Sequence, residues 1–239
     1  MTTASLALCF DAPLQSWGTR SRGIIRDTTR EPTKSGVVGL LAAALGKHRA
    51  DDEATQALAN LHMAVRVDRE GILERDYHTT QNVPTTEGKG HRTVVSERYY
   101  LADALFLVVL EGDPALLREL HDRVDRPHWP LFFGRRAFVP ARPLLTREAL
   151  SERPAADVIT THPWLEIDPD VRNTERRRPA TDRTPLRTVT DCTPTTPGAE
   201  PRHDHPVSII QRTFRTRHVL VADTDLTDEM IRTGETSCS

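Results

Sequence analysis

Cysteine is scarce in this chain of 239 residues, and its three copies, Cys9, Cys192 and Cys238, are widely spaced and odd in number. That usage excludes a disulfide framework and a CxxC metal knuckle. Long apolar runs are also missing, because the longest, Val37 to Leu45, is far too short to span a bilayer. The first residues carry no basic stretch ahead of their apolar segment, and Asp11 interrupts that segment. We therefore expect no secretory signal and no membrane contact, and a cytoplasmic protein.

The chain also lacks the net positive charge of a free nucleic-acid binder. Its formal net charge is −2 at pH 7, so any contact with a polyanion must rest on local clusters of basic side chains. Lysine is nearly absent: only three of the 32 basic residues are lysines, which leaves 29 arginines. Arginine suits forked phosphate contacts and base stacking, but GC-rich coding gives the same excess. Composition alone does not decide between these two explanations.

Apolar patterning predicts alternating strands and helices over the first 143 residues. In chain order, the expected elements are a strand at Ser5–Phe10, a helix that starts at Pro32 or Thr33 and ends before Gly46, strands at His62–Asp68 and Leu105–Leu110, a helix at Asp113–Val124 and a strand at Ala137–Val139. This order is that of an α+β, ferredoxin-like (βαββαβ) domain. A polar excursion at Arg75–Ser96 interrupts it and favours a long hairpin or a mobile loop.

The composition changes from Leu144 onward, where prolines, threonines and charges are dense. Pro169–His205 has no sustained apolar period, so we expect its middle to be loop or partly disordered. Short strands are predicted at Leu186–Val189 and His218–Ala222. We therefore predict a ferredoxin-like domain at residues 1–143, with the excursion protruding from it, and a small β-rich C-terminal subdomain at residues 144–239 with a partly flexible middle.

Two segments have the character of a phosphate site. The loop from Gln15 to Gly36 ends at a helix N-terminus, where the helix dipole and free N–H groups favour an anion. Its basic residues are Arg20, Arg22, Arg26, Arg30 and Lys34. The alternative is a solvated loop whose Thr33 only caps a core helix. Gly134–Arg136 could likewise bring backbone to a phosphate, or be a glycine bulge before an edge strand. No GxxxxGK[ST] pattern precedes the helix, so nucleotide hydrolysis is not supported.

Arginines and aromatics flank the polar excursion on both sides, in Arg75–Thr79 and Ser96–Leu101. Aromatic faces stack unpaired bases, and this is how single-stranded RNA is commonly held. The alternative is that Tyr77, Tyr99 and Tyr100 are half-buried strand residues with a hydroxyl at the surface. We expect the alternative to apply to two of the three tyrosines.

Enzymatic chemistry has weaker support in the sequence. Tyr77, His78 and Lys89 could form a general acid/base set for metal-independent RNA cleavage, although a lone loop histidine is more often polar surface. His203 and His205 lie two residues apart without another fixed ligand, which is a weak metal signal. We expect no metal site and no cofactor.

Six segments of the sequence form an ordered series of motifs: Leu14–Gly18, Pro32–Gly46, Ala64–Gly71, Asp76–Thr79, Ser96–Leu110 and Pro130–Pro140. Together they resemble the CasD family of type I-E CRISPR Cascade, within the RAMP superfamily. The resemblance covers about the first 145 residues. It agrees with the fold class reached from patterning, because RAMP proteins use ferredoxin-like domains to bind CRISPR RNA.

The resemblance implies a non-catalytic RNA-binding subunit of an antiviral surveillance ribonucleoprotein complex. Such a subunit holds the 5′ handle of the guide RNA (crRNA), joins the CasC backbone subunit to the CasA large subunit, and meets target DNA only through the complex. Its thumb hairpin would span about Arg75 to Tyr99. A related type I-C branch cleaves precursor crRNA with a Tyr/Lys/His set, and Tyr77, His78 and Lys89 do not align convincingly with it. An endoribonuclease of that kind is the alternative function.

The resemblance also implies a set of RNA-facing residues in the basic loop, at the base of the excursion and after the second apolar helix. The set is Gln15, Ser16, Trp17, Arg20, Arg22, Arg26, Lys34, Ser35, Tyr77, His78, Arg98, Tyr99, Gly134, Arg135 and Arg136. No catalytic residue is predicted.

Overall fold

The computed structural model describes residues 4–19 and 23–233. These residues form, in order, β1 (Ala4–Asp11), β2 (Leu14–Gln15), β3 (Ile25–Arg26), α1 (Lys34–Leu45), α2 (Asp52–Ala59), β4 (His62–Arg69), β5 (Ile72–Pro84), β6 (His91–Ala102), β7 (Leu105–Gly112), α3 (Pro114–Asp125), β8 (Leu145–Ser151), α4 (Ala155–Thr161), α5 (Pro169–Arg177), the short 3-10 helix η1 (Ala180–Asp182), β9 (Leu186–Cys192), β10 (Glu200–Ser208), β11 (Thr213–Thr224) and α6 (Asp228–Thr233). The predicted α+β class is confirmed.

An antiparallel seven-stranded sheet forms the centre of the molecule, in the order β10-β11-β9-β4-β7-β1-β8. The strand predicted from alternation, His62–Asp68, and the strand predicted from a continuous apolar run, Leu105–Leu110, are β4 and β7 in its middle. The two predicted helices are α1 and α3. Helix α1 begins after Thr33, whose side chain accepts a hydrogen bond from the Gly36 N–H, and ends at Gly46 in the left-handed conformation.

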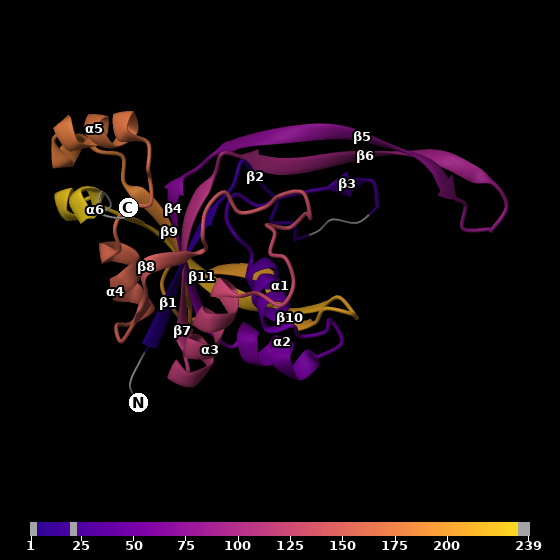
Figure 1. Cartoon of the computed structure of the whole chain (residues 1–239), viewed down its shortest axis with the longest axis horizontal. Helices are drawn as coiled ribbons and strands as arrows, with labels where there is room; N and C mark the ends of the chain where they lie inside the picture. Colours follow the sequence, from indigo (N-terminus) through magenta and orange to yellow (C-terminus); the bar gives the residue numbers. More distant parts are fainter. Residues whose placement is uncertain (1–3, 20–22, 234–239) are drawn as a thin grey trace.

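Helices cover both faces of this sheet, with α1 to α3 on one side and α4 to α6 on the other (Figure 1). Alternate residues of β7 supply the two cores, since successive side chains of a strand point to opposite faces. Phe106 and Val108 belong to the larger core under α1 to α3. Leu107 and Val109 pack with α4 residues such as Val158 on the opposite face. The continuous apolar run of β7 therefore reflects burial on both faces.

The C-terminal strands belong to the same sheet as the N-terminal ones. Strand β9 pairs with β4, β11 pairs with β9, and β8 pairs with β1. The strands predicted at Leu186–Val189 and His218–Ala222 are confirmed as parts of β9 and β11. The division into domains at residues 143 and 144 stays a prediction, and the hydrogen bonding of the sheet runs across it.

The polar excursion forms a long hairpin, in which β5 pairs with β6 from Ile72↔Ala102 to Pro84↔His91. The hairpin projects away from the body of the molecule, and the short strands β2 and β3 lie beside its base (Figure 1). Most residues of β5 are exposed. The hairpin therefore has no core of its own beyond its base, in keeping with its polar sequence.

The last strand of the predicted βαββαβ unit was placed wrongly. Ala137–Val139 lies in a loop, where Phe138 is buried and accepts a hydrogen bond from Phe133 N–H through its carbonyl oxygen (2.8 Å). The edge position beside β1 is taken instead by β8, with Leu6 opposite Leu150. The apolar residues at 137–139 anchor a loop to the core, and the charged residues of β8 obscured its alternation.

Helix α5 was also not expected, because Pro169–His205 was predicted to be loop in its middle. Local capping explains the helix: Pro169 occupies the first turn, and the Asp168 carboxylate accepts a hydrogen bond from the Asp170 N–H (2.8 Å). Its one buried residue is Arg172, whose Nη1 donates to the Glu166 carbonyl (2.7 Å). A helix held by a buried arginine has no apolar period to detect.

Candidate nucleic-acid interface

The base of the hairpin places three charged residues side by side in one row, and an apolar, an acidic and an aromatic residue in the next. Strand β6 pairs in parallel with β3 on one side and antiparallel with β5 on the other. Arg98 lies between Arg26 and Asp76 in this register. Glu97, the next residue, lies between Ile25 and Tyr77. Directly opposite residues share a face, so the two rows point to opposite sides of the hairpin.

Arg135 joins the charged face from the loop after α3. Its Nη2 donates to the Tyr99 carbonyl (2.8 Å), and its guanidinium lies 5.3 Å from the centre of the Phe138 ring. Burial lowers the pKa of Arg135, the charges of Arg98 and Arg26 lower it further, and Asp76 and Tyr100 partly oppose this shift. Guanidinium groups stay protonated in proteins, so these three arginines repel one another. An anion bound among them would relieve that repulsion.

Arg26 and Arg98 have unused donors. The Arg98 Nε donates to Ser96 Oγ (3.2 Å). Arg26 is exposed and makes no ion pair or side-chain hydrogen bond with any residue the structure describes. The two guanidinium groups can therefore offer forked contacts to phosphate oxygens without breaking an existing ion pair.

Arg98 and Arg135 line a hollow of about 420 Å³, which we call the arginine hollow. It is lined by Leu14, Arg75, Asp76, Tyr77, Arg98, Tyr100, Arg135, Ala137 and Phe138. Segments far apart in the sequence meet here, and three members of the predicted set, Tyr77, Arg98 and Arg135, are among the lining residues. Arg75, Tyr100 and Phe138 were not in that set, although Arg75 and Tyr100 lie within the two segments predicted to flank the excursion.

The three tyrosines of the hairpin base divide as expected. Tyr77 is 68% exposed, whereas Tyr99 and Tyr100 are half-buried. Tyr100 packs against Phe138 with ring centres 5.9 Å apart, and the Tyr99 hydroxyl donates to Glu97 (3.4 Å). Tyr77 is therefore the tyrosine with a free ring face for a base.

The start of the basic loop is core, and this corrects the prediction that Gln15 and Trp17 face RNA. Both side chains are at most 1% exposed. Gln15 Nε2 donates to the Phe10 and Ala104 carbonyls (3.1 and 2.8 Å), and its Oε1 accepts from the Trp17 indole (3.2 Å). Ser16 is also buried, with its Oγ 3.3 Å from the Tyr99 carbonyl oxygen. These residues support the hairpin base from beneath.

The N-terminus of α1 already holds an anion that belongs to the protein. The Lys34 N–H donates to Asp204 Oδ2 (2.8 Å). The Lys34 ammonium is buried and lies 2.6 Å from Asp191, so the predicted contact of Lys34 with a phosphate is also corrected. Burial opposes ionisation of Asp191, but Lys34 and Arg217 outweigh it and hold the pKa of Asp191 below its usual range. We call Lys34, Asp191, Asp204 and Arg217 the ion network.

The remaining predicted residues are divided between the interior, the surface and the part that is not described. Ser35 is half-buried beside Thr33, and Arg136 is exposed. Gly134 has a φ of +86°, and a Cβ there would lie 1.9 Å from the Ser16 carbonyl oxygen. Gly134 thus lets the loop that carries Arg135 and Arg136 pack against the backbone of Ser16. Arg20 and Arg22 lie outside the described residues.

Tyr77, His78 and Lys89 do not form a catalytic set. Tyr77 and His78 are successive residues of β5, so their side chains point to opposite faces. Lys89 lies in the turn beyond Pro84, which is about 23 Å along the strand from Tyr77 at ~3.3 Å per residue. His78 instead lies 3.7 Å from Asp76. The geometry brings no general acid and base together at this place.

Residues 4–19 and 23–233 contain neither a cluster of metal-ligating side chains nor a helix that could cross a membrane. In that part of the chain, no three His, Cys, Asp or Glu side chains are grouped so that they could hold a metal ion. None of its helices is long and apolar enough to cross a membrane.

Comparisons with known proteins agree with the six sequence segments. The CRISPR-associated protein (Cas_Cas5) family matches residues 5–220. The CRISPR system Cascade subunit CasD of Escherichia coli (strain K12) is 34% identical over 173 residues, which cover 66% of this chain and 77% of the relative. These matches confirm the predicted resemblance to CasD.

Two solved structures share the fold over nearly the whole chain. One, described as a crystal structure of a Cas protein, has a TM-score of 0.70 at 36% identity and covers 95% of this chain and 96% of its own. The other, from a CRISPR RNA-guided surveillance complex, has a TM-score of 0.73 at 29% identity and covers 95% and 92%. The chain belongs to the CRISPR-associated protein (Cas_Cas5) family.

Proposed function

We propose that this protein is a non-catalytic crRNA-binding subunit of a type I-E Cascade complex, where it holds the 5′ handle of the guide RNA. The observation that carries the proposal is the arginine hollow, which is lined by Arg75, Arg98 and Arg135 together with one carboxylate, Asp76, and beside which Arg26 lies opposite Arg98 on β3. Membership of the family and the names of the CasD relative and of the surveillance complex support it. The complex is an antiviral, cytoplasmic ribonucleoprotein in this proposal.

The handle is held mainly through its phosphates in this scheme. A net charge of −2 gives the free chain no long-range attraction for RNA, so binding depends on the local arginine set. Phosphate contacts position a strand but do not read its bases. Tyr77, which is 68% exposed, adds a stacking face at the lining of the same hollow. The RNA would therefore lie along the base of the hairpin and contact the arginines and Tyr77 together.

The hairpin and the sheet have separate roles in the assembly. We infer that β5–β6 is a thumb, centred on residues 75–99, which reaches the CasC backbone subunit; its length and exposed side chains support this. The body would meet the CasA large subunit, and target DNA only through the complex. The ferredoxin-like assignment is supported by the strand order β8-β1-β7-β4 together with α1 and α3.

Handle-RNA binding by complexes that carry single arginine substitutions tests the proposal. Arg98→Ala and Arg135→Ala should each weaken binding of a repeat-derived RNA and lower the log–log salt slope by roughly 0.7 for each phosphate that the variant no longer neutralises. Arg123→Ala, an exposed arginine on α3, is the matched control and should leave both quantities unchanged. Unchanged salt slopes in both hairpin-base variants would contradict the proposal. Cleavage of the RNA by the wild-type subunit without metal would favour an endoribonuclease instead.

A further inference from the structure

The hairpin formed by β10 and β11 carries basic side chains that no carboxylate of its own compensates. Residues 205–222 contain no Asp or Glu, but they contain three arginines and two histidines. Arg212, in the turn of the hairpin, and Arg215, on β11, are exposed. Neither makes an ion pair or a side-chain hydrogen bond with any residue the structure describes. We call residues 205–215 the basic arm.

The electrostatic potential at the start of the basic arm is positive. His205 lies directly opposite Arg215 in the β10–β11 register, so the two side chains share a face of the hairpin. Burial lowers the pKa of His205, and the charge of Lys34 lowers it further. Asp191 opposes this shift in part, but Arg215 and Arg217 add to it. Positive charges therefore outweigh the carboxylate at His205, and an anion would be stabilised there.

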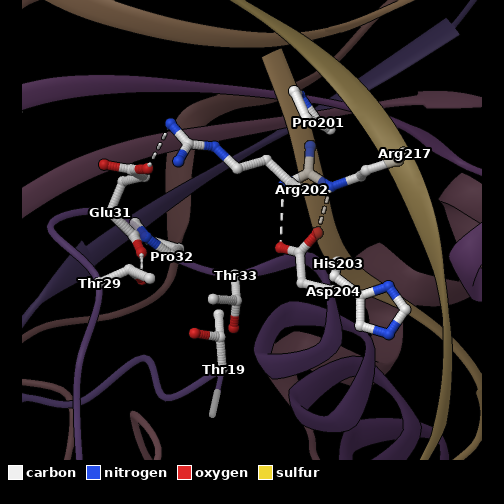
Figure 2. A pocket seen from close by; sticks show the side chains of 10 residues that line it. All are labelled: Thr19, Thr29, Glu31, Pro32, Thr33, Pro201, Arg202, His203, Asp204 and Arg217. Carbon is white, nitrogen blue, oxygen red and sulfur yellow. Dashed lines mark hydrogen bonds and ion pairs between the residues drawn. The ribbon is translucent and has the colours of Figure 1, made fainter.

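The carboxylates between β10 and the loop that precedes α1 are already paired. Figure 2 shows Glu31 beside Arg202, and Asp204 beside Arg217, in a hollow of about 290 Å³ that separates this loop from β10. Glu31 Oε2 also accepts from Arg187 Nη1 (2.9 Å). Arg217 donates to both oxygens of Asp204 (2.7 and 3.0 Å). Because each carboxylate already faces a cation of its own, neither offsets the charge of the basic arm.

Arg30 lies between the arginine hollow and the basic arm. It is exposed and, like Arg26, has no ion-pair or side-chain hydrogen-bond partner among the described residues. Arg30 follows Arg26 by four residues, which limits their Cα separation to about 14 Å. The segment that carries Arg30 lies across the 290 Å³ hollow from β10, because residues 31–33 line it together with residues 201–204. Strands β3 and β10 both lie on the side of the molecule toward which the β5–β6 hairpin projects (Figure 1). One strand of RNA can therefore contact them in turn.

We propose that Arg30 and the basic arm continue the phosphate track of the guide RNA beyond the arginine hollow, an inference that rests on the proposed function. The ligand is the backbone of single-stranded RNA, because the arm offers free guanidinium groups, which contact phosphate oxygens in forked geometry. Such contacts hold a strand through its charge and do not select its bases. The subunit thus grips the RNA at two places, which the loop that precedes α1 connects.

The test measures binding of a fifteen-nucleotide oligouridine to the full-length protein by fluorescence anisotropy, over a series of salt concentrations that starts at low salt. The double variant Arg212→Ala, Arg215→Ala should lower the log–log salt slope by about 1.4, since each lost phosphate contact lowers it by about 0.7. The double variant Arg118→Ala, Arg123→Ala is the matched control, because it removes two exposed arginines of α3 and changes the net charge equally. The slope of the control should equal that of the wild type.

A conservative variant separates the charge of the arm from its structure. Arg212→Lys combined with Arg215→Lys keeps both charges and should keep the wild-type slope, because an ammonium binds phosphate as a point charge. Equal losses of slope in the lysine and alanine variants would refute the proposal, since charge would then not be the cause.

Arg98→Ala, measured beside these variants, separates this inference from the proposed function. A lower slope in Arg98→Ala but not in Arg212→Ala, Arg215→Ala overturns the role of the basic arm and leaves the proposed function standing. Unchanged slopes in both overturn the two together. A loss in the arm variant that appears with a DNA duplex of fifteen base pairs, and not with oligouridine, would assign the arm to DNA and contradict this inference.

Discussion

Asp191 is the centre of the ion network, and replacing it by asparagine tests whether that network stabilises the fold. Its carboxylate lies 2.6 Å from the Lys34 ammonium, accepts from the Met63 N–H (2.9 Å), and pairs with Arg217. The side chains of Lys34, Arg217 and Asp191 are 6%, 9% and 12% exposed. Asp191→Asn keeps the size of the side chain but removes the charge that both cations face.

The expected loss in the free energy of unfolding depends on which ion-pair partners Lys34 and Arg217 keep in Asp191→Asn. Removing one partner of a buried ion pair costs about 3 to 5 kcal/mol, because the other charge is left uncompensated. Arg217 retains Asp204, with which it makes two hydrogen bonds. Lys34 has Asp191 as its one ion-pair partner among the described residues, and burial already lowers the pKa of Lys34. We therefore expect a loss near the lower end, about 3 kcal/mol in the free energy of unfolding.

Urea unfolding at pH 7 measures this loss, with Asp223→Asn as the control because Asp223 is an exposed aspartate on β11. The control should change stability by less than about 0.5 kcal/mol. The double variant Lys34→Met, Asp191→Asn removes the stranded ammonium and should recover at least half of the loss. A loss below about 1 kcal/mol in Asp191→Asn, or a double variant no more stable than the single one, would refute the reasoning.

Acid stability, Gly134 and the exposed hairpin each give a further prediction. The pKa of Asp191 in the folded protein is held below its usual range. Asp191 therefore stabilises the fold above the unfolded pKa of about 3.9, and this contribution is lost as the pH falls through the folded pKa. The free energy of unfolding should fall less steeply below about pH 4 in Asp191→Asn than in the wild type, and equal slopes would contradict this. Gly134→Ala should lower the free energy of unfolding by more than about 2 kcal/mol, because its Cβ would lie 1.9 Å from the Ser16 carbonyl oxygen. Gly88→Ala is the control: Gly88 has a φ of +69° with open space around it, so this substitution should cost about 1 kcal/mol. Equal changes in melting temperature in the two variants would exclude the steric explanation. Because β5 of the hairpin is mostly exposed, limited proteolysis should cut the free protein near residues 85–90. The same segment should be protected in the complex with guide RNA and CasC. Equal protection in both states would contradict the proposal that the hairpin is a thumb that contacts CasC.

Local sequence was enough for the parts of the fold whose causes are local. Helix α1 could be placed from Thr33 and Gly46, because capping groups act within one turn. Helix α3 could be placed from Asp113 and the following proline for the same reason. Strand β4 was predicted from alternation and β7 from a continuous apolar run. The family was reached from six ordered segments, which preserve residue identity without requiring any contact to be known.

Pairing between strands determined the features of the fold and of the site that the sequence alone did not predict. The apolar loop at 137–139 has the more strand-like composition, and only pairing with β1 selects the charged segment of β8 as the edge strand. Tyr77, Arg98 and Arg135 come from three segments, and the register of β3, β6 and β5 together with the hydrogen bond to the Tyr99 carbonyl bring them to one hollow. No local pattern encodes that register.

The basic residues show most clearly that the sequence does not determine which charged side chains are free to bind a ligand. Lys34 and Arg26 belong to one loop and were equally good candidates for phosphate contacts in the sequence. The tertiary structure separates them, because Asp191 and Asp204 reach Lys34 from 157 and 170 residues away and neutralise it in the interior, while Arg26 remains at the surface with no partner among the described residues. Charge is a property of the sequence, but whether a charge is free to meet a ligand depends on burial and pairing, which only the folded chain determines.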